Sequence, residues 1–246
     1  MVPLVPFTAH GDGAGRTRVD VVGQAGGRVP EQAARRAVGR TSVRGQILDA
    51  LRAALVGGEL APGEVYSAPV LGERFGVSAT PVREAMQQLA AEGAVEVVPN
   101  RGFRVLERGA RERAELAEVR ALIEVPVVLR LARTVPAERW GELVPLAEAT
   151  VAAAAEGDVA RYAEADRAFH GAMLSLSGNR QLVLVADGLH RRAQWPVAGG
   201  RSLGRRAELV ADAAEHMALL EALVAGELGV VPGLVAEHFA GSGSGA

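Results

Sequence analysis

Three histidines and one aspartate have the residue types and the spacing of a metal site. Asp166 and His170 are four residues apart, so on a helix both side chains project from one side and can bind one ion. His216 and His238 each lie among apolar residues, on the side of a predicted helix that faces the interior. Three imidazoles and one carboxylate in an apolar interior are typical of a site for Zn²⁺ or another divalent metal such as Ni²⁺ or Mn²⁺.

Other interpretations of this set stay open. Each histidine taken alone is more often a satisfied residue of the core than a metal ligand. A bound metal could serve the fold only, or it could activate water in a metal-dependent hydrolase. No obvious general base stands beside the four residues, which argues against the hydrolase. The remaining histidine of this half, His190, is interpreted as a surface or core residue.

The composition narrows the class of protein. The chain has 246 residues, 49% of them hydrophobic and only 4% aromatic, which predicts a packed aliphatic core. It has no cysteine, which excludes disulfide scaffolds, thiolate metal sites and cysteine nucleophiles. No apolar run is long enough to cross a bilayer and no signal segment is visible. We therefore expect a soluble cytoplasmic protein that does not associate with a membrane. The net charge of -2 offers no broad attraction to nucleic acid, and every basic side chain is an arginine.

The elements of the first half have the order of a DNA-binding domain. Apolar periodicity and turn signals predict helices over 43–55, 70–75 and 80–89, and strands over 94–98 and 103–106. Three helices followed by a hairpin form a winged helix–turn–helix. The sequence therefore predicts a mainly α protein that begins with such a domain.

The third helix carries side chains suited to reading DNA. Gly76 ends the preceding helix, Thr80 is the expected N-cap and Pro81 the first helical residue. Arg83 and Gln87 lie opposite the apolar face, where they can reach base edges in a major groove. An ordinary two-helix corner is the alternative for this stretch alone.

Four motifs make the first half similar to a known family. They are Gly58-Glu59-Leu60-Ala61-Pro62-Gly63, the run from Gly76 to Ala85, Leu89-Ala90-Ala91-Glu92-Gly93, and Pro99-Asn100-Arg101-Gly102-Phe103. Residues 43 to 106 resemble the DNA-binding domain of the GntR family of bacterial transcription regulators. Two positions depart from the family pattern, because Ala79 stands where arginine is usual and Ala68-Pro69 replaces a polar pair.

This resemblance implies roles for individual residues in DNA binding. Arg83 is implied as a base contact, Ser78 and Thr80 as phosphate contacts, and Arg101 with Gly102 as the tip of the wing near the minor groove. The partner would be double-stranded DNA with an inverted-repeat operator, bound by a homodimer.

The second half is predicted to be an all-α helical bundle. The motifs are Glu118-Val119-Arg120-Ala121-Leu122-Ile123-Glu124, Asp166-Arg167-Ala168-Phe169-His170, Ser177-Gly178-Asn179, Glu215-His216 and Glu237-His238. Residues 112 to 239 resemble the FCD effector domain, which follows the winged helix in the FadR-like branch of the family.

The FCD resemblance implies the ligands of the bundle. Asp166, His170, His216 and His238 are the implied metal ligands, and a small organic acid is the implied effector. Arg120 is the candidate for its carboxylate, since a guanidinium can donate two parallel hydrogen bonds. Pairing of Arg120 with Glu124 one turn later is an equal alternative. His238 is the least secure ligand, because Pro232 and Gly233 should shorten or kink the last helix.

Together these patterns predict a DNA-binding regulator rather than an enzyme, organised in four segments. Residues 1–40 form a disordered tail, 41–108 the winged helix–turn–helix, 111–239 the metal- and effector-binding domain, and 240–246 a flexible Gly-Ser tail. We expect a ligand-responsive repressor whose helical domain binds a divalent metal and a small organic acid.

Overall fold

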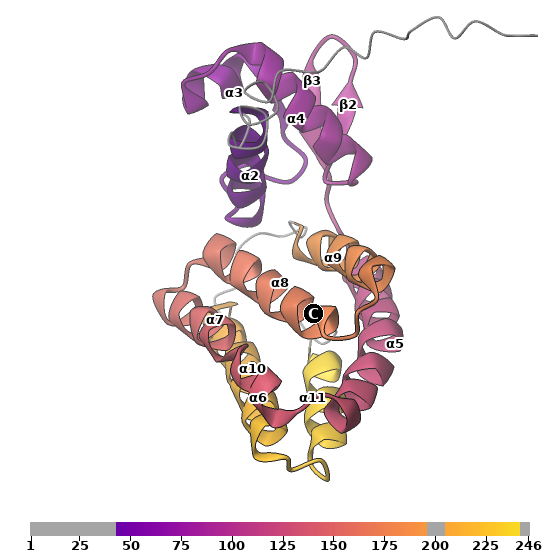
Figure 1. Ribbon diagram of the computed structural model, residues 1–246. Helices are drawn as coiled ribbons and strands as arrows, with labels where there is room; N and C mark the ends of the chain where they lie inside the picture. Colours follow the sequence, from indigo (N-terminus) through magenta and orange to yellow (C-terminus); the bar gives the residue numbers. More distant parts are fainter. Residues whose placement is uncertain (1–42, 196–204, 242–246) are drawn as a thin grey trace, which may run out of the picture. The chain divides into compact units, whose positions relative to one another are not determined.

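The computed structural model describes residues 43–195 and 205–241 of the chain. The predicted N-terminal tail and nearly all of the predicted C-terminal tail lie outside these residues. Within them the protein is mainly helical with one small sheet, so the predicted fold class is confirmed (Figure 1).

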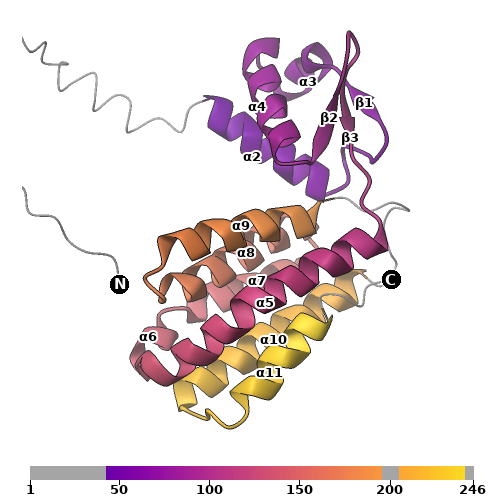
Figure 2. The same cartoon turned by 90° about the vertical axis from the view of Figure 1, so that its right-hand side faces the viewer.

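The first half is a winged helix–turn–helix. Its elements are α2 (Val43–Val56), β1 (Val65–Tyr66), α3 (Ala68–Phe75), α4 (Ala79–Ala91), β2 (Val95–Val98) and β3 (Gly102–Val105). The three strands form an antiparallel sheet in the order β1-β3-β2 (Figure 2). The sequence did not predict β1, because a run of two residues carries no period that could be recognised.

An aliphatic core holds these elements together. Leu51 and Leu55 of α2 pack with Met86 and Leu89 of α4, and each of these four side chains is fully buried. Between α3 and α4 the chain turns at Gly76, whose φ of 67° is the left-handed conformation that favours glycine. The turn therefore fixes how α4 follows α3.

The start of α4 differs from the prediction. The helix begins at Ala79 and its N-cap is Ser78, so the assignment of Thr80 as N-cap is wrong by two residues. The backbone of Ser78 is extended, and its side chain makes no capping hydrogen bond. Pro81 still lies in the first turn, where a missing N–H costs nothing.

The second half is a bundle of helices. They are α5 (Ala110–Thr134), α6 (Ala137–Gly141), α7 (Val144–Glu156), α8 (Val159–Ser175), α9 (Arg180–Gln194), α10 (Arg205–Ala225) and α11 (Val231–Gly241). Helix α8 packs against α7 and α9, α5 against α9 and α11, and α10 against α7 and α11. None of the helices within 43–195 and 205–241 is long and apolar enough to cross a membrane.

The buried face of α5 carries charged residues as well as apolar ones. Leu116, Val127 and Leu131 are buried, whereas Val119 is 42% exposed. Arg120 and Glu124 are buried beside them, one helical turn apart. Two charged residues therefore occupy a face that an apolar pattern cannot reveal.

The last helix begins at Val231, and Pro232 lies in its first turn. A proline is tolerated there because the first N–H groups of a helix have no intrahelical partner. Pro232 thus marks the start of α11 rather than a kink within it, and His238 follows almost two turns later.

Candidate functional site

The four predicted metal ligands come together in the interior of the bundle. Asp166 and His170 extend from α8, His216 from α10 and His238 from α11, and all four are buried. Nε2 of His170 lies 3.2 Å from Nε2 of His216 and 3.2 Å from Nε2 of His238. Oδ1 of Asp166 lies 3.5 Å from Nε2 of His170 and 3.5 Å from Nε2 of His216.

These separations suit one tetrahedral ion. Nitrogen and oxygen ligands lie about 2.0–2.1 Å from Zn²⁺, which places neighbouring ligands of a tetrahedron about 3.3–3.4 Å apart. The separations of His170 from His216 and His238, and of Asp166 from His170 and His216, are close to that distance, and the ligand nitrogens of the three histidines all lie within 4.8 Å of one another. Their chemistry and their spacing therefore both fit a divalent metal.

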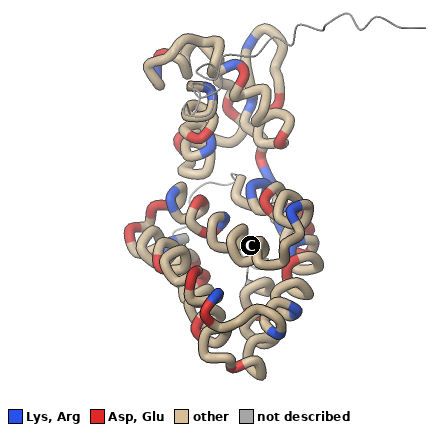
Figure 3. The backbone as a smooth tube through the Cα atoms, viewed as in Figure 1, with Lys and Arg blue, Asp and Glu red and all other residues tan. Residues whose placement is uncertain are grey.

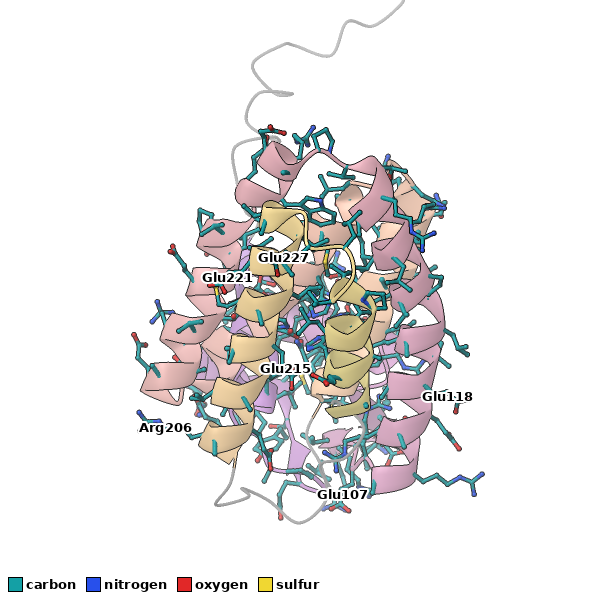
Figure 4. The ribbon with its side chains drawn as sticks, turned by 90° about the horizontal axis from the view of Figure 1, so that it is seen from below. Glu107, Glu118, Arg206, Glu215, Glu221 and Glu227 are labelled. Carbon is teal, nitrogen blue, oxygen red and sulfur yellow. The ribbon has the colours of Figure 1, made fainter. Side chains whose placement is uncertain are left out.

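Two of the histidines have a carboxylate on the ring nitrogen that faces away from the centre. Oε2 of Glu124 lies 2.9 Å from Nδ1 of His170, and Oε2 of Glu215 lies 3.0 Å from Nδ1 of His238. Figure 4 shows Glu215 between α10 and α11, whereas Glu118 points outward from α5. Because carboxylates accept, each Nδ1 carries the proton and each Nε2 presents a lone pair to the centre.

His216 is fixed in the same way by a hydroxyl group. The Thr150 hydroxyl donates to the carbonyl of Ala147 at 2.7 Å, so its oxygen can accept from Nδ1 of His216, 3.4 Å away. Three Nε2 lone pairs would then face one another, with no proton to share between them. Such an arrangement repels itself unless a cation lies at the centre.

The ionisation of these groups agrees with metal binding. Burial lowers the pKa of His170 and of His216 to about 3, so both rings are neutral at pH 7. Burial would raise the pKa of Asp166, but the neighbouring imidazoles of His190, His170 and His216 hold it well below its usual value. A neutral set of imidazoles beside an ionised carboxylate is the form that binds metals.

Arg120 lies beside the metal ligands and is already paired. Its Nε donates to Oε1 of Glu124 at 3.0 Å, and the ion pair is almost completely buried. The alternative pairing expected from the sequence is therefore present. Burial raises the pKa of Glu124, but hydrogen bonds with His170 and His190 outweigh it, and the net pKa lies below the usual value.

His190 is the residue that sequence reasoning missed. Its side chain is 2% exposed and contacts both Arg120 and Glu124. The buried residues of α9 are Ala186 and His190, four residues apart. Two buried residues are too few to give a periodic signal, so the sequence pattern did not place His190 at the site.

The helix expected to read DNA presents its predicted residues outward. Ser78, Thr80, Arg83 and Gln87 are exposed at or near the N-terminal part of α4. The opposite face of the helix is buried in the core. Among the described residues the guanidinium of Arg83 has no hydrogen bond or ion pair, so it is available to a ligand.

The next glutamine along α4 has a different environment. Gln88 accepts a hydrogen bond from Arg44 of α2 at 2.9 Å and donates one to Glu92 at 3.1 Å. Glu92 also pairs with Arg52, at 2.5 Å. Gln88 thus ties α4 to α2, while Gln87 points to solvent.

The wing places Arg101 on an exposed turn between β2 and β3. Its neighbour Gly102 has φ 132°, and a Cβ atom there would lie 2.2 Å from the carbonyl oxygen of Tyr66. The approach of β1 to β3 therefore requires glycine at this position.

Figure 3 shows acidic and basic residues interspersed along the helices rather than gathered in one field.

A winged helix with an exposed third helix, joined in one chain to a helical domain with a buried histidine cluster, is the arrangement of a DNA-binding regulator with a second, helical domain. Residues 43–105 match the model of the bacterial regulatory proteins of the gntR family, and residues 115–241 match the FCD domain. The chain belongs to the GntR family of bacterial transcription regulators, in the branch that carries an FCD domain.

Similar proteins are regulators as well. The chain is 32% identical to the HTH-type transcriptional regulator McbR of Escherichia coli over 124 residues, which are 50% of this chain and 56% of McbR. It is 28% identical to the "Probable D-xylose utilization operon transcriptional repressor" of Paenarthrobacter nicotinovorans, over 82% of this chain and 87% of that protein. The solved structure of E. coli McbR/YncC superposes with a TM-score of 0.67 at 27% identity, covering 82% of this chain and 95% of that one. The relatives are transcription regulators rather than enzymes, so the hydrolase interpretation is set aside.

Proposed function

We propose that this regulator is a homodimeric repressor whose affinity for DNA responds to a small organic acid bound beside a divalent metal. The observation that carries the proposal is the convergence of three Nε2 atoms and one carboxylate oxygen, each within 3.5 Å of another, in the interior of the bundle.

The proposed ligands of the metal are Asp166, His170, His216 and His238. We propose Zn²⁺, because nitrogen-rich tetrahedral sites suit it, while Ni²⁺ and Mn²⁺ are the alternatives. When bound, the ion supplies a Lewis-acidic position to which an acid group of the effector can bind. The four residues of the chain would hold the ion at a buried position.

Arg120 is the proposed partner of the effector's carboxylate. A guanidinium carries five N–H groups, and the contacts with Glu124 and His190 engage only two of its three nitrogens. A carboxylate can therefore bind Arg120 without first breaking the ion pair with Glu124. Effector binding would change operator affinity only through its different affinity for the two arrangements of the regulator.

In the DNA-binding half, Arg83 and Gln87 are the proposed base contacts, Ser78 and Thr80 the phosphate contacts, and Arg101 with Gly102 the wing contacts. Two copies of α4 would enter successive major grooves of an inverted repeat. The repressor assignment follows the name of the relative from P. nicotinovorans.

The test is fluorescence anisotropy with the DNA upstream of the gene, at a stated salt concentration, against scrambled DNA of equal length. We expect sequence-dependent binding that is lost in Arg83→Ala and kept in Arg139→Ala, which removes an exposed arginine from α6. Unchanged affinity and sequence preference in Arg83→Ala would remove Arg83 from the reading role.

The metal is tested in the same assay. Chelation that abolishes the response to an organic acid while the protein stays folded supports a sensing metal. A purely structural metal gives a different result. Chelation then unfolds the bundle, while the fraction of protein that stays folded still responds to the organic acid.

A further inference from the structure

The two ring nitrogens of His190 face different parts of the site. Nε2 lies 2.5 Å from Nη2 of Arg120 and 3.2 Å from Oε1 of Glu124. Nδ1 is buried and has no hydrogen bond within the described part of the chain. The acceptor that faces it is Oδ2 of Asp166, 3.5 Å away.

The contact with Asp166 determines where a proton of this ring lies. Nδ1 faces Oδ2 of the Asp166 carboxylate, which can only accept, so Nδ1 carries a proton that points toward Asp166. Nε2 faces Arg120, which only donates, and two oxygens of Glu124, which only accept, at 3.2 and 3.5 Å. The proton on Nδ1 is present whichever of these two partners Nε2 serves.

Helix α9 offers Asp166 a second donor. Gln194, four residues after His190, donates from Nε2 to Oδ2 of Asp166 at 3.0 Å and to the carbonyl of Ala163 at 2.8 Å. Both groups of α9 therefore face Oδ2, and Oδ1 is left to face the imidazoles of the metal site. Outer partners of this kind fix the orientation of a ligand and raise metal affinity.

We propose that His190 is a positioning residue that couples Arg120 to the metal ligand Asp166. The inference deepens the proposed function and rests on it. When the carboxylate of the effector draws Arg120 away from His190, the hydrogen bonding of the His190 ring changes, and this ring contacts Asp166. The acid and the metal then alter each other's affinity by the same factor, because coupling between two binding sites is reciprocal.

Two nearly isosteric variants separate the two nitrogens of the ring. The amide nitrogen of asparagine can take the place of Nδ1, and the amide of glutamine that of Nε2. We expect His190→Asn to bind Zn²⁺ nearly as the unchanged protein does, and His190→Gln to bind it about 10-fold or more weakly. Zn²⁺ affinity is measured by competition with a chromophoric chelator, and the visible absorption of bound Co²⁺ reports the geometry of the site.

Gln194→Ala removes the other donor without changing the imidazole, and we expect it also to weaken Zn²⁺ binding. Melting curves recorded without metal show whether each variant is folded. If His190→Gln and Gln194→Ala are folded and keep the Zn²⁺ affinity and the Co²⁺ spectrum of the unchanged protein, the positioning role is wrong.

A double-mutant cycle tests the link to Arg120 with the metal alone. We expect Arg120→Gln to lower Zn²⁺ affinity when His190 is present and to have little further effect in His190→Gln. Effects that multiply independently would show that His190 does not connect the two residues. Failure of the unchanged protein to bind Zn²⁺ would contradict the proposed metal site itself, whereas normal binding with insensitive variants contradicts only this inference.

Discussion

Oε2 of Glu124 lies 2.9 Å from Nδ1 of His170, with exposed fractions of 0% and 1% for the two residues. Glu124 belongs to α5 and His170 to α8, so this contact joins the long helix to the proposed metal site. A buried carboxylate on the outer nitrogen fixes the orientation of the ring and makes Nε2 a stronger donor to a metal.

Replacing this carboxylate should weaken metal binding. We expect Glu124→Gln to reduce Zn²⁺ affinity about 10- to 100-fold, because a neutral amide is a poorer partner for Nδ1. Competition with a chelator measures the change. Glu118→Gln alters an exposed glutamate of the same helix and should leave the affinity unchanged. Equal affinities for the two variants would show that Glu124 does not support His170.

Metal should stabilise the bundle through His238. A ligand at 1,000 times its dissociation constant stabilises the folded state by about 4 kcal/mol. We therefore expect Zn²⁺ to raise the melting temperature of the unchanged protein and of Glu237→Ala, which alters an exposed neighbour. The rise should be much smaller in His238→Ala. A full rise in that variant would mean that His238 is not a ligand.

The metal-free protein should lose stability in mild acid. Burial lowers the pKa of His170 and His216 to about 3, from the ordinary histidine value of 6.5. Between these values the unfolded chain binds protons that the folded chain does not, so stability is fully present above about pH 6.5 and falls as the pH drops.

The expected slope is about 1.4 kcal/mol per pH unit for each histidine below pH 6.5. Urea unfolding of chelator-treated protein between pH 8 and pH 5 measures it, in roughly half-unit steps. His216→Gln should remove the contribution of one histidine, so the slope should fall by about 1.4 kcal/mol per pH unit. A stability that is flat over this range would contradict the burial of two neutral imidazoles.

Two adjacent glutamines of α4 should behave differently. Gln87 is exposed, so Gln87→Ala should weaken specific DNA binding by about 1–3 kcal/mol while the melting temperature stays unchanged. Gln88 bonds Arg44 and Glu92, so Gln88→Ala should lower the melting temperature and leave sequence preference unchanged. Anisotropy and melting curves on both variants give the comparison. The reverse pattern would move the reading face of α4 by one residue.

Much of the fold could be predicted from the glycine and proline residues at helix ends and from the periodicity of apolar residues. Gly76 and Pro81 bracket the turn before α4, and the apolar residues of that helix recur at helical spacing. The proposed metal ligands stood out because Asp166 and His170 share one helical face, whereas their meeting with two distant histidines came from the family resemblance. The spacing of residues along one helix shows which side chains share a face. It does not show which helices come into contact with each other.

The surroundings of the site could not be predicted in the same way. Arg120 and Glu124 lie on the buried face of α5, where a rule that places charged residues outside does not expect them. The apolar Val119 of the same helix is exposed instead. His190 lies on a helix whose inner stripe is only two residues wide, too short for a periodic signal. Buried polar networks become visible only when the partners from other helices are known.

The proposed ligands are distributed over α8, α10 and α11, and the outermost two, Asp166 and His238, are far apart in the chain. One ion bound there would act as a reversible cross-link that closes a long loop, with an entropic effect on the unfolded chain similar to that of a disulfide. In a protein without cysteine, such a clip is independent of redox conditions.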